Sequence, residues 1–141
     1  MKHVDYVYTV GMSEAAVEER LRESESGVLA LARGGSAYAV PVSHHYEDGV
    51  IHLRLADDDQ SEKLAAAETT EEATYVCYGT DDGETWSIVA SGPLRRTGVV
   101  DPETSNERFG PLHVFDEAIE DVTLVGFELR VERIAGRRTA G

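Results

Sequence analysis

Three side chains in the middle of the sequence suit the binding of a phosphate: Arg54, Ser61 and Lys63. The planar guanidinium of arginine can hold two phosphate oxygens at once, and lysine adds a second positive charge. Ser61 can cap a short helix whose first N–H groups and positive dipole end also attract an anion. Lys63 falls in the first turn of that helix, where a cation is unfavourable unless an anion is present. This combination predicts a phosphate site between a strand and a helix.

The same residues also permit a simpler interpretation. Asp57 to Asp59 and Glu62 lie beside Lys63 in the sequence, so the ammonium group can pair with a neighbouring carboxylate or remain solvated. Arg54 is then an ordinary residue on a strand surface. The aspartates also repel an anion unless they point outward into salt, where screening is strong. Spacing alone leaves both interpretations open.

Other reactive side chains give no comparable signal. His44 and His45 are neighbours in an expected strand, so their imidazoles point to opposite faces and do not chelate one metal ion together. Cys77 falls in an apolar strand, without the basic and open surroundings that activate a thiolate. The sequence has no phosphate-binding glycine loop, no Gly-x-Gly-x-x-Gly, no nucleophile elbow and no cysteine pair for zinc. We therefore assign no metal ligand and no catalytic residue.

The composition limits the partners and the location of the protein. Its 141 residues include 27 acidic and 13 basic side chains, for a net charge of -14, which excludes nucleic acid and anionic membrane surfaces as partners. The acids are spread along the chain, and only two of the basic residues are lysines, which favours adaptation to a salt-rich cytoplasm over an acidic interaction surface. A single cysteine, the lack of a signal-peptide pattern and the lack of a long apolar run predict a cytoplasmic protein.

Hydrophobic patterning predicts a mainly β domain with short helices. A helix is expected over 13–24 and another over 61–68, and strands are expected over 27–33, 36–46, 50–56, 73–79, 84–100 and 122–134. Turn residues at 34–35, 47–49 and 81–83 join neighbouring strands into hairpins. Pro41 lacks an N–H donor, so it should lie at a sheet edge or a bulge.

About six hairpin-joined strands with few helices indicate a small antiparallel barrel or sandwich rather than a doubly wound sheet. The length suits one domain over 1–141, for which residues 1–10 and 137–141 are expected to be flexible ends.

The order of these segments resembles the pyridoxamine 5'-phosphate oxidase-like family of flavin-binding split barrels, particularly its nitroimidazole-resistance-like branch. The similar stretches are GVLALARGGSAYAVPVSHHYEDGVIHLRLA, then SEKL, then ETWSIVASGPLRR, and finally ELRVERIAGRR. Together they span about residues 13 to 136, and their order is more specific than any single motif. The resemblance implies a six-stranded antiparallel Greek-key split β-barrel that forms a homodimer, with FMN bound at the interface.

The resemblance also implies roles for particular residues. Arg54, Ser61 and Lys63 match the family's phosphate-binding pattern of Arg or His followed by Ser-x-Lys. The AVPVS segment matches the strand that lines the flavin ring, which implies ring contacts for Val40, Pro41, Val42 and Ser43. Trp86, followed by Ser87, matches a Trp-Ser pair near the cofactor, and core packing is the alternative role for Trp86.

The resemblance implies the chemistry of an FMN-dependent oxidoreductase acting on a small organic molecule, with the flavin accepting or donating a hydride. His44 and Tyr46 follow the ring-lining segment and are candidate substrate contacts. The alternatives are a deazaflavin- or haem-binding split barrel and a non-catalytic flavin-binding or interaction protein. Residues that bind the substrate phosphate in true pyridoxamine-phosphate oxidases have no convincing match here, so vitamin B6 oxidation is not the expected activity.

Overall fold

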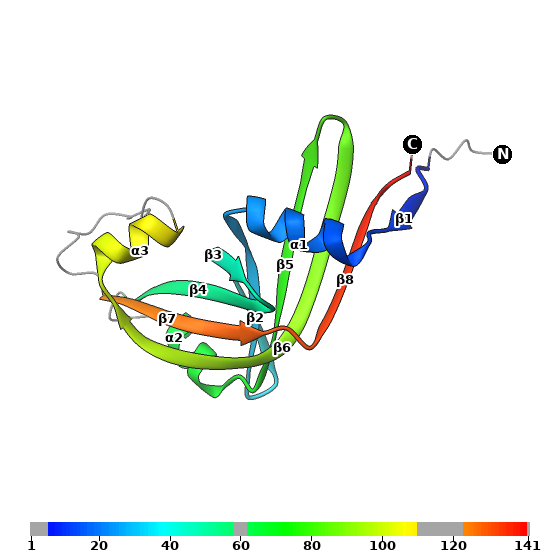
Figure 1. The fold of residues 1–141 in the computed structure, drawn as a ribbon. Helices are drawn as coiled ribbons and strands as arrows, with labels where there is room; N and C mark the ends of the chain where they lie inside the picture. Colours follow the sequence, from blue (N-terminus) through cyan, green and yellow to red (C-terminus); the bar gives the residue numbers. More distant parts are fainter. Residues whose placement is uncertain (1–5, 58–61, 110–122, 141) are drawn as a thin grey trace.

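The computed structural model describes residues 6–57, 62–109 and 123–140 (Figure 1). Over these ranges the chain forms, in order, β1 (Thr9–Gly11), α1 (Glu14–Glu23), β2 (Ser26–Arg33), β3 (Ser36–Glu47), β4 (Val50–Asp57), α2 (Glu62–Thr69), β5 (Glu72–Asp81), β6 (Glu84–Val100), α3 (Pro102–Phe109), β7 (Thr123–Arg130) and β8 (Arg133–Thr139). None of these helices is long and apolar enough to cross a membrane.

The described strands form one antiparallel sheet that closes on itself. Their order is β1-β8-β6-β5-β2-β3-β4-β7, and a further pairing between β6 and β7 joins β2 to β7 into a closed ring. Consecutive strands β2, β3 and β4 are neighbours while β5 returns to lie beside β2, which is a Greek-key arrangement. The predicted antiparallel Greek-key barrel is confirmed, and β8 and β1 extend the sheet beyond the ring.

Three tight hairpins set the register of the ring. Each has a two-residue turn with positive φ at both positions: Gly34-Gly35, Asp48-Gly49 and Asp82-Gly83. Positive φ at both positions defines a type I′ turn, whose twist matches that of the flanking strands and which favours glycine and aspartate. The three turns predicted from the sequence are therefore confirmed.

Strand β6 belongs both to the ring and to the extension of the sheet. Residues 86–91 pair with β8, and residues 94–100 pair with β7. The change of partner occurs at Gly92, where a Cβ atom would overlap the carbonyl oxygen of Arg130. Glycine therefore permits the close approach of the chain that connects β7 to β8.

The core fills the inside of the ring. Its most buried large side chains come from five of the six ring strands and from α1, and they include Leu21, Leu29, Ile51, Leu53, Leu55, Tyr75, Ile88, Phe127 and Leu129, while β3 adds Val42 and Tyr46. Helix α2 adds Ala66 and Ala67 to this cluster, and α1 adds Val17. These helices lie on the barrel because their apolar faces are buried in the same core.

The ends of the elements differ from the expectations in two places. Helix α1 begins as predicted, with the Ser13 hydroxyl accepting a hydrogen bond from the Ala16 N–H. The expected strand over 122–134 is instead two strands, β7 and β8, separated at Val131-Glu132. Residues 9–10 and 137–139, expected to be flexible, belong instead to β1 and β8, which pair with each other, and β8 also pairs with β6. In Figure 1 the first and last described strands, β1 and β8, lie side by side at one side of the molecule.

Candidate functional site

Arg54 occupies a covered position on the outside of the barrel. It alternates along β4 with Leu53 and Leu55, which point into the core, so its own side chain points outward. Its strand neighbours are Ser43 on β3 and Gly126 on β7. Only 6% of Arg54 is exposed, since α3 lies over this face and contributes Ser105 and Phe109. The predicted phosphate anchor is thus enclosed.

The guanidinium of Arg54 is held by hydroxyl groups and an aromatic ring. Its Nη1 donates to the Ser105 Oγ at 2.9 Å, and its Nη2 donates to the Ser43 Oγ at 3.5 Å. The Phe109 ring lies against it, with the ring centre 5.4 Å from the guanidinium carbon. Burial lowers the pKa of Arg54, which nevertheless stays charged at neutral pH. The result is a buried positive charge next to two hydroxyls.

The predicted ring-lining segment of β3 presents two different faces. Pro41 and Ser43 point outward, on the side of Arg54, whereas Val40 and Val42 pack against the core. The side chains of the two valines therefore cannot contact a ligand on the outer face, although their backbone can. Pro41 pairs with Val28 on one side only, because β4 joins β3 from Ser43 onward, so the predicted edge position is confirmed.

A surface without charged side chains continues from Pro41 across three further strands. We call it the uncharged face, and it consists of Ala37, Ala39 and Pro41 on β3, Val28, Ala30 and Ala32 on β2, Thr74, Val76 and Tyr78 on β5, and Ser87, Val89 and Ser91 on β6. Charged side chains border it on the same side of the sheet: Glu72 on β5, and Arg133 and Arg137 on β8. Tyr78 is 71% exposed and Val89 is 44% exposed. Such a surface is unexpected on a protein with a net charge of -14.

The two other predicted phosphate ligands are only partly covered by the structure. Ser61 lies outside the described residues, and so does the side chain of Lys63. The backbone places Lys63 in the first turn of α2, the helix that follows β4 in the chain. The convergence of Lys63 and Ser61 on Arg54 stays a prediction.

Trp86 lies away from Arg54 within one chain. It is buried on β6 in the part that pairs with β8, opposite Arg138. Arg54, in contrast, pairs with Gly126 of β7, and Gly126 pairs with Gly98 at the other end of β6. Arg20 of α1 covers the Trp86 ring at 5.1 Å. Within a single chain, Trp86 therefore packs under α1 rather than beside the guanidinium.

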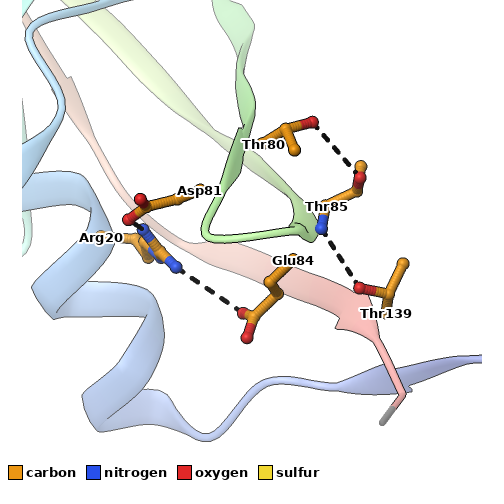
Figure 2. A network of polar contacts seen from close by, with 6 residues as sticks. All are labelled: Arg20, Thr80, Asp81, Glu84, Thr85 and Thr139. Atoms are coloured by element: carbon orange, nitrogen blue, oxygen red, sulfur yellow. Dashed lines mark hydrogen bonds and ion pairs between the residues drawn. The ribbon is translucent and has the colours of Figure 1, made fainter.

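Arg20 belongs to a polar network that fastens α1 to the β5–β6 hairpin (Figure 2). Its Nη1 is 2.9 Å from the Asp81 Oδ2, and its Nη2 is 3.7 Å from the Glu84 Oε1. The hydrogen bond to Asp81 raises the pKa of Arg20. The Thr85 N–H donates to the Thr139 hydroxyl at 3.1 Å and ties the same hairpin to β8. This second arginine is neutralised by carboxylates of its own chain.

The two candidate substrate contacts, His44 and Tyr46, point into the protein instead of toward the outer face. His44 is 2% exposed; its Nε2 lies 2.9 Å from the Leu21 carbonyl oxygen, to which it donates, and its Nδ1 accepts from the Tyr75 hydroxyl at 2.5 Å. Burial lowers the pKa of His44, so the ring is neutral near pH 7. Tyr46 donates to the Glu18 carboxylate at 3.0 Å. Both side chains therefore have structural partners.

His45 and Cys77 behave as the sequence indicates. His45 faces outward, opposite to His44, and lies 6.0 Å from the His52 ring and 6.4 Å from the Phe109 ring between centres. Cys77 is buried, and burial raises the pKa of its thiol, which keeps it protonated. Among the described residues, no three His, Cys, Asp or Glu side chains are grouped to hold a metal ion.

Sequence reasoning missed the contribution of α3. Ser105 and Phe109 contact Arg54, but they lie outside the helices expected over 13–24 and 61–68. One available clue was the period of the helix. Ser105 and Phe109 are four residues apart and therefore lie on one face.

Comparisons with solved structures agree with the fold. The FAD-binding protein from Mesorhizobium loti has a TM-score of 0.72 at 17% identity, covering 94% of this chain and 99% of that one. An FAD-binding protein from Mycobacterium smegmatis gives 0.65 at 16% identity, covering 93% and 98%. A protein from the same organism described as binding FAD and haem gives 0.59 at 14% identity, covering 92% and 72%. At these identities the likeness establishes a shared fold.

The sequence itself connects the chain to a family. No curated protein matches it. The model of the pyridoxamine 5'-phosphate oxidase family, however, matches residues 13–138, which is nearly the whole chain. The closed Greek-key ring and the enclosed arginine thus lie in a chain that belongs to the pyridoxamine 5'-phosphate oxidase family.

Proposed function

We propose that this protein binds FMN, with the phosphate held at Arg54 and the ring along the outer side of β3. The observation that carries the proposal is the buried guanidinium of Arg54 between the Ser43 and Ser105 hydroxyls. A guanidinium and hydroxyl groups supply hydrogen-bond donors, which is the set that a phosphate requires. An anion would also offset part of the cost of burying a positive charge.

The residues next to Arg54 suit the rest of such a ligand. Pro41 and Ser43 present a flat strand surface that continues into the uncharged face, and this surface suits a planar ring. Enclosure of Arg54 under α3 favours a ligand that ends in a phosphate over one that continues beyond it, as FAD does. We therefore propose FMN rather than FAD, although three similar solved structures are described as binding FAD.

The uncharged face supports a homodimer with the cofactor at its interface. A second copy of the same face would bury Tyr78 and Val89, and the charged Arg133 and Arg137 of β8 would lie at the border of the contact. Because Pro41 lies both on this face and near Arg54, the partner chain would approach the proposed ring position. Trp86, which is distant from Arg54 within one chain, then remains a candidate cofactor contact across the interface.

We further propose that the protein is an oxidoreductase of the nitroimidazole-resistance-like branch, acting on a small organic molecule. Bound FMN would supply hydride transfer, whereas the protein supplies binding, orientation and shielding. Arg54 and the serine hydroxyls hold the phosphate, Pro41 and the β3 backbone set the position of the ring, and the uncharged face excludes water. The salt-rich cytoplasm suggested by the composition is where we expect it to act.

A visible absorption spectrum of the protein purified in molar salt tests the proposal. We expect a flavin band after purification or after addition of FMN, quenched flavin fluorescence, and a dimer by light scattering. Parallel additions of FAD, a deazaflavin and haem, followed by mass spectrometry of the retained molecule, identify the preferred cofactor. A colourless protein that retains none of them would overturn cofactor binding.

A second measurement separates an enzyme from a flavin carrier. The FMN-loaded protein is reduced with NADH or NADPH, and its reoxidation is followed with small electron acceptors, including nitroaromatic compounds. Turnover faster than that of free FMN under the same conditions supports the oxidoreductase. Bound FMN without such turnover would instead indicate a carrier or an interaction protein.

A further inference from the structure

A cavity of about 570 Å³ is formed by α1, the turn between β3 and β4, and residues 131–136 around the connection from β7 to β8. It is separate from the proposed cofactor site, because α3, which covers Arg54, lies at the opposite end of the molecule from β8 (Figure 1). Apolar side chains line much of the cavity: Met12, Val17, Val131 and Ile134. A cavity of this size with an apolar lining suits a small organic molecule.

Main-chain hydrogen bonds connect the walls of the cavity. The Val131 N–H donates to the Gly49 carbonyl oxygen at 3.0 Å, which joins the β7–β8 connection to the β3–β4 turn. The Met12 N–H donates to the Gly136 carbonyl oxygen at 2.9 Å, which joins the residues before α1 to β8. Because the walls are already fixed to one another, a ligand would bind without the cost of ordering them.

Three carboxylates also line the cavity: Glu14 and Glu18 of α1, and Glu132. Glu14 and Glu18 are four residues apart on one face of the helix, where like charges repel. Within the described part of the chain, the side chains of Glu14 and Glu132 take part in no hydrogen bond or ion pair. None of the described lining residues is a lysine or an arginine. The lining therefore carries negative charge without a cation of its own.

Glu18 has partners that hold it in the wall. Its Oε1 accepts from the Tyr46 hydroxyl at 3.0 Å, and its Oε2 lies 3.9 Å from the Arg22 Nη2. Burial, together with the bond to Glu18, raises the pKa of Tyr46, so the phenol stays neutral. The Arg22 side chain is 56% exposed and does not line the cavity, and such an exposed pair offsets little of the charge on Glu18.

A second hollow beside α1 shows the opposite arrangement. There Asp81 and Glu84 face Arg20, and Arg138 also lines the hollow, so the carboxylates have cations from their own chain. A metal ion is a poor occupant for the first cavity. The described residues contain no group of His, Cys, Asp and Glu arranged to hold one, and apolar side chains cannot replace its oxygen ligands.

We propose that the cavity between α1 and the β7–β8 connection binds a small organic cation, namely an amine with an apolar body. The carboxylates of Glu14, Glu18 and Glu132 pair with the ammonium group, and the apolar side chains cover the hydrocarbon part. A bound cation also relieves the repulsion between Glu14 and Glu18. The inference does not rest on the proposed function, because none of these residues belongs to the proposed FMN site.

Three probes of similar shape and different charge test the proposal at neutral pH. Phenylpropylamine is a cation, phenylpropanol is neutral, and phenylpropanoate is an anion. We expect calorimetric titration of the unmodified protein in low salt to give a dissociation constant of about 1 mM or lower for the amine. The alcohol should bind at least about 5-fold more weakly, since it lacks the ion pairs, and the carboxylate should bind more weakly still.

Variants of single residues separate the carboxylates from the apolar lining. Glu132→Gln, at an exposed position where folding is unaffected, and Glu18→Gln, which keeps an acceptor for Tyr46, should each weaken amine binding by about 3- to 5-fold and leave alcohol binding unchanged. Ile134→Ala should weaken both by a similar factor. Glu107→Gln, an exposed carboxylate on α3, changes the net charge equally and should alter amine binding by less than about 2-fold.

Nuclear magnetic resonance locates the bound amine, whose addition should shift the amide signals of Gly49 and residues 131–136. Shifts confined to another part of the chain would overturn the proposal, and so would a protein that binds no amine. Equal affinities for the three probes would show an apolar cavity that does not select a cation. Equal losses in Glu132→Gln and Glu107→Gln would show attraction by the net charge alone. A failure of FMN binding, measured separately by flavin fluorescence, would leave these expectations unchanged.

Discussion

Arg20 and Arg54 lie against aromatic rings in the same small protein, yet they differ in burial and in the groups that receive their hydrogen bonds. Arg20 is partly exposed, lies over Trp86 and faces the carboxylates of Asp81 and Glu84. Arg54 is buried, lies against Phe109 and donates to serine hydroxyls. The pKa of Arg20 is raised by its hydrogen bond to Asp81, whereas burial lowers that of Arg54.

The difference indicates different uses for the same side chain. Arg20 already has anions from its own chain, so its contacts fasten α1 to a hairpin. Arg54 donates to the hydroxyls of Ser43 and Ser105, which can also orient an anion from outside. In a chain with 27 acidic residues, a buried arginine held by hydroxyls is the more informative of the two.

The strongest test of this contrast is the loss of FMN affinity when each arginine is removed. Arg54→Ala should weaken FMN binding by about 1 to 3 kcal/mol, since it removes a charge-assisted hydrogen bond at an enclosed site. Lys63→Ala should have a loss in the same range if Lys63 joins the site. Arg20→Ala is the matched control and should leave the affinity unchanged. Equal losses for Arg20→Ala and Arg54→Ala, measured by flavin fluorescence, would contradict the division of roles.

A low pH should disturb the core contact between His44 and α1, which connects the region of Arg54 with that of Arg20. His44 follows Ser43 in β3 and bonds to the carbonyl of Leu21, the neighbour of Arg20 on α1. Its pKa in the folded protein lies below the ordinary 6.5, mainly because of burial, so the unfolded chain binds the proton more readily. The contribution of His44 to stability is therefore complete above about pH 6.5 and declines as the pH falls below it.

Chemical unfolding between pH 8 and pH 4 measures this decline. His44→Gln, which cannot be protonated in this range, should show a shallower loss of stability near pH 6 than the unmodified protein. Glu128 also contributes to stability, and its contribution is lost over a lower pH range than that of His44. Its hydrogen bond with Arg95 lowers its pKa from 4.5, so that part of the stability is lost only as the pH falls below about 4.5. An identical pH dependence in His44→Gln would show that His44 does not titrate as inferred.

The contribution of Arg20 to stability should be modest. Exposed ion pairs contribute about 0.2 to 1 kcal/mol, and stacking of the guanidinium on Trp86 adds a similar amount. Arg20→Ala should therefore reduce the free energy of unfolding by about 1 kcal/mol, measured by urea denaturation. Arg22→Ala is the control on the same helix, where the contact with Glu18 is longer, at 3.9 Å, and more exposed. A larger loss for Arg22→Ala than for Arg20→Ala would argue against the network in Figure 2.

The smallest expected effect is a difference in salt sensitivity. Salt screens exposed ion pairs more than buried contacts, with a Debye length of about 3 Å in molar salt. The stability difference between the Arg20→Ala variant and the unmodified protein should thus shrink by a few tenths of a kcal/mol between low and molar salt. The equivalent difference for Arg54→Ala should change less. Comparable changes for both variants would remove the distinction between an exposed and an enclosed arginine.

Local signals in the sequence were sufficient to predict most of the fold. The three hairpins follow from short turn sequences with glycine, and Ser13 marks the start of α1. The division between β7 and β8 was missed because Val131 and Glu132 lack the glycine or proline that usually interrupts a strand. Residues 137–139 were expected to fray because their pairing partners, β1 and β6, are far away in the sequence.

The site was less predictable because it depends on contacts between distant segments. The resemblance identified Arg54 and the β3 segment, but alternation along that strand sends Val40 and Val42 into the core. Ser105 lies 51 positions from Arg54 in the sequence, and no local pattern predicts that α3 covers β4. Only closure of the ring through β6 and β7 brings α3 to that face.

Strand β6 belongs both to the ring and to the extension of the sheet, and this has a consequence for how the protein unfolds. One continuous strand supplies partners to β5, β7 and β8, so the outer strands cannot separate from the ring without loss of pairing along β6. Unfolding should accordingly be a single cooperative event, and amide hydrogens of β6 should be among the slowest to exchange with solvent.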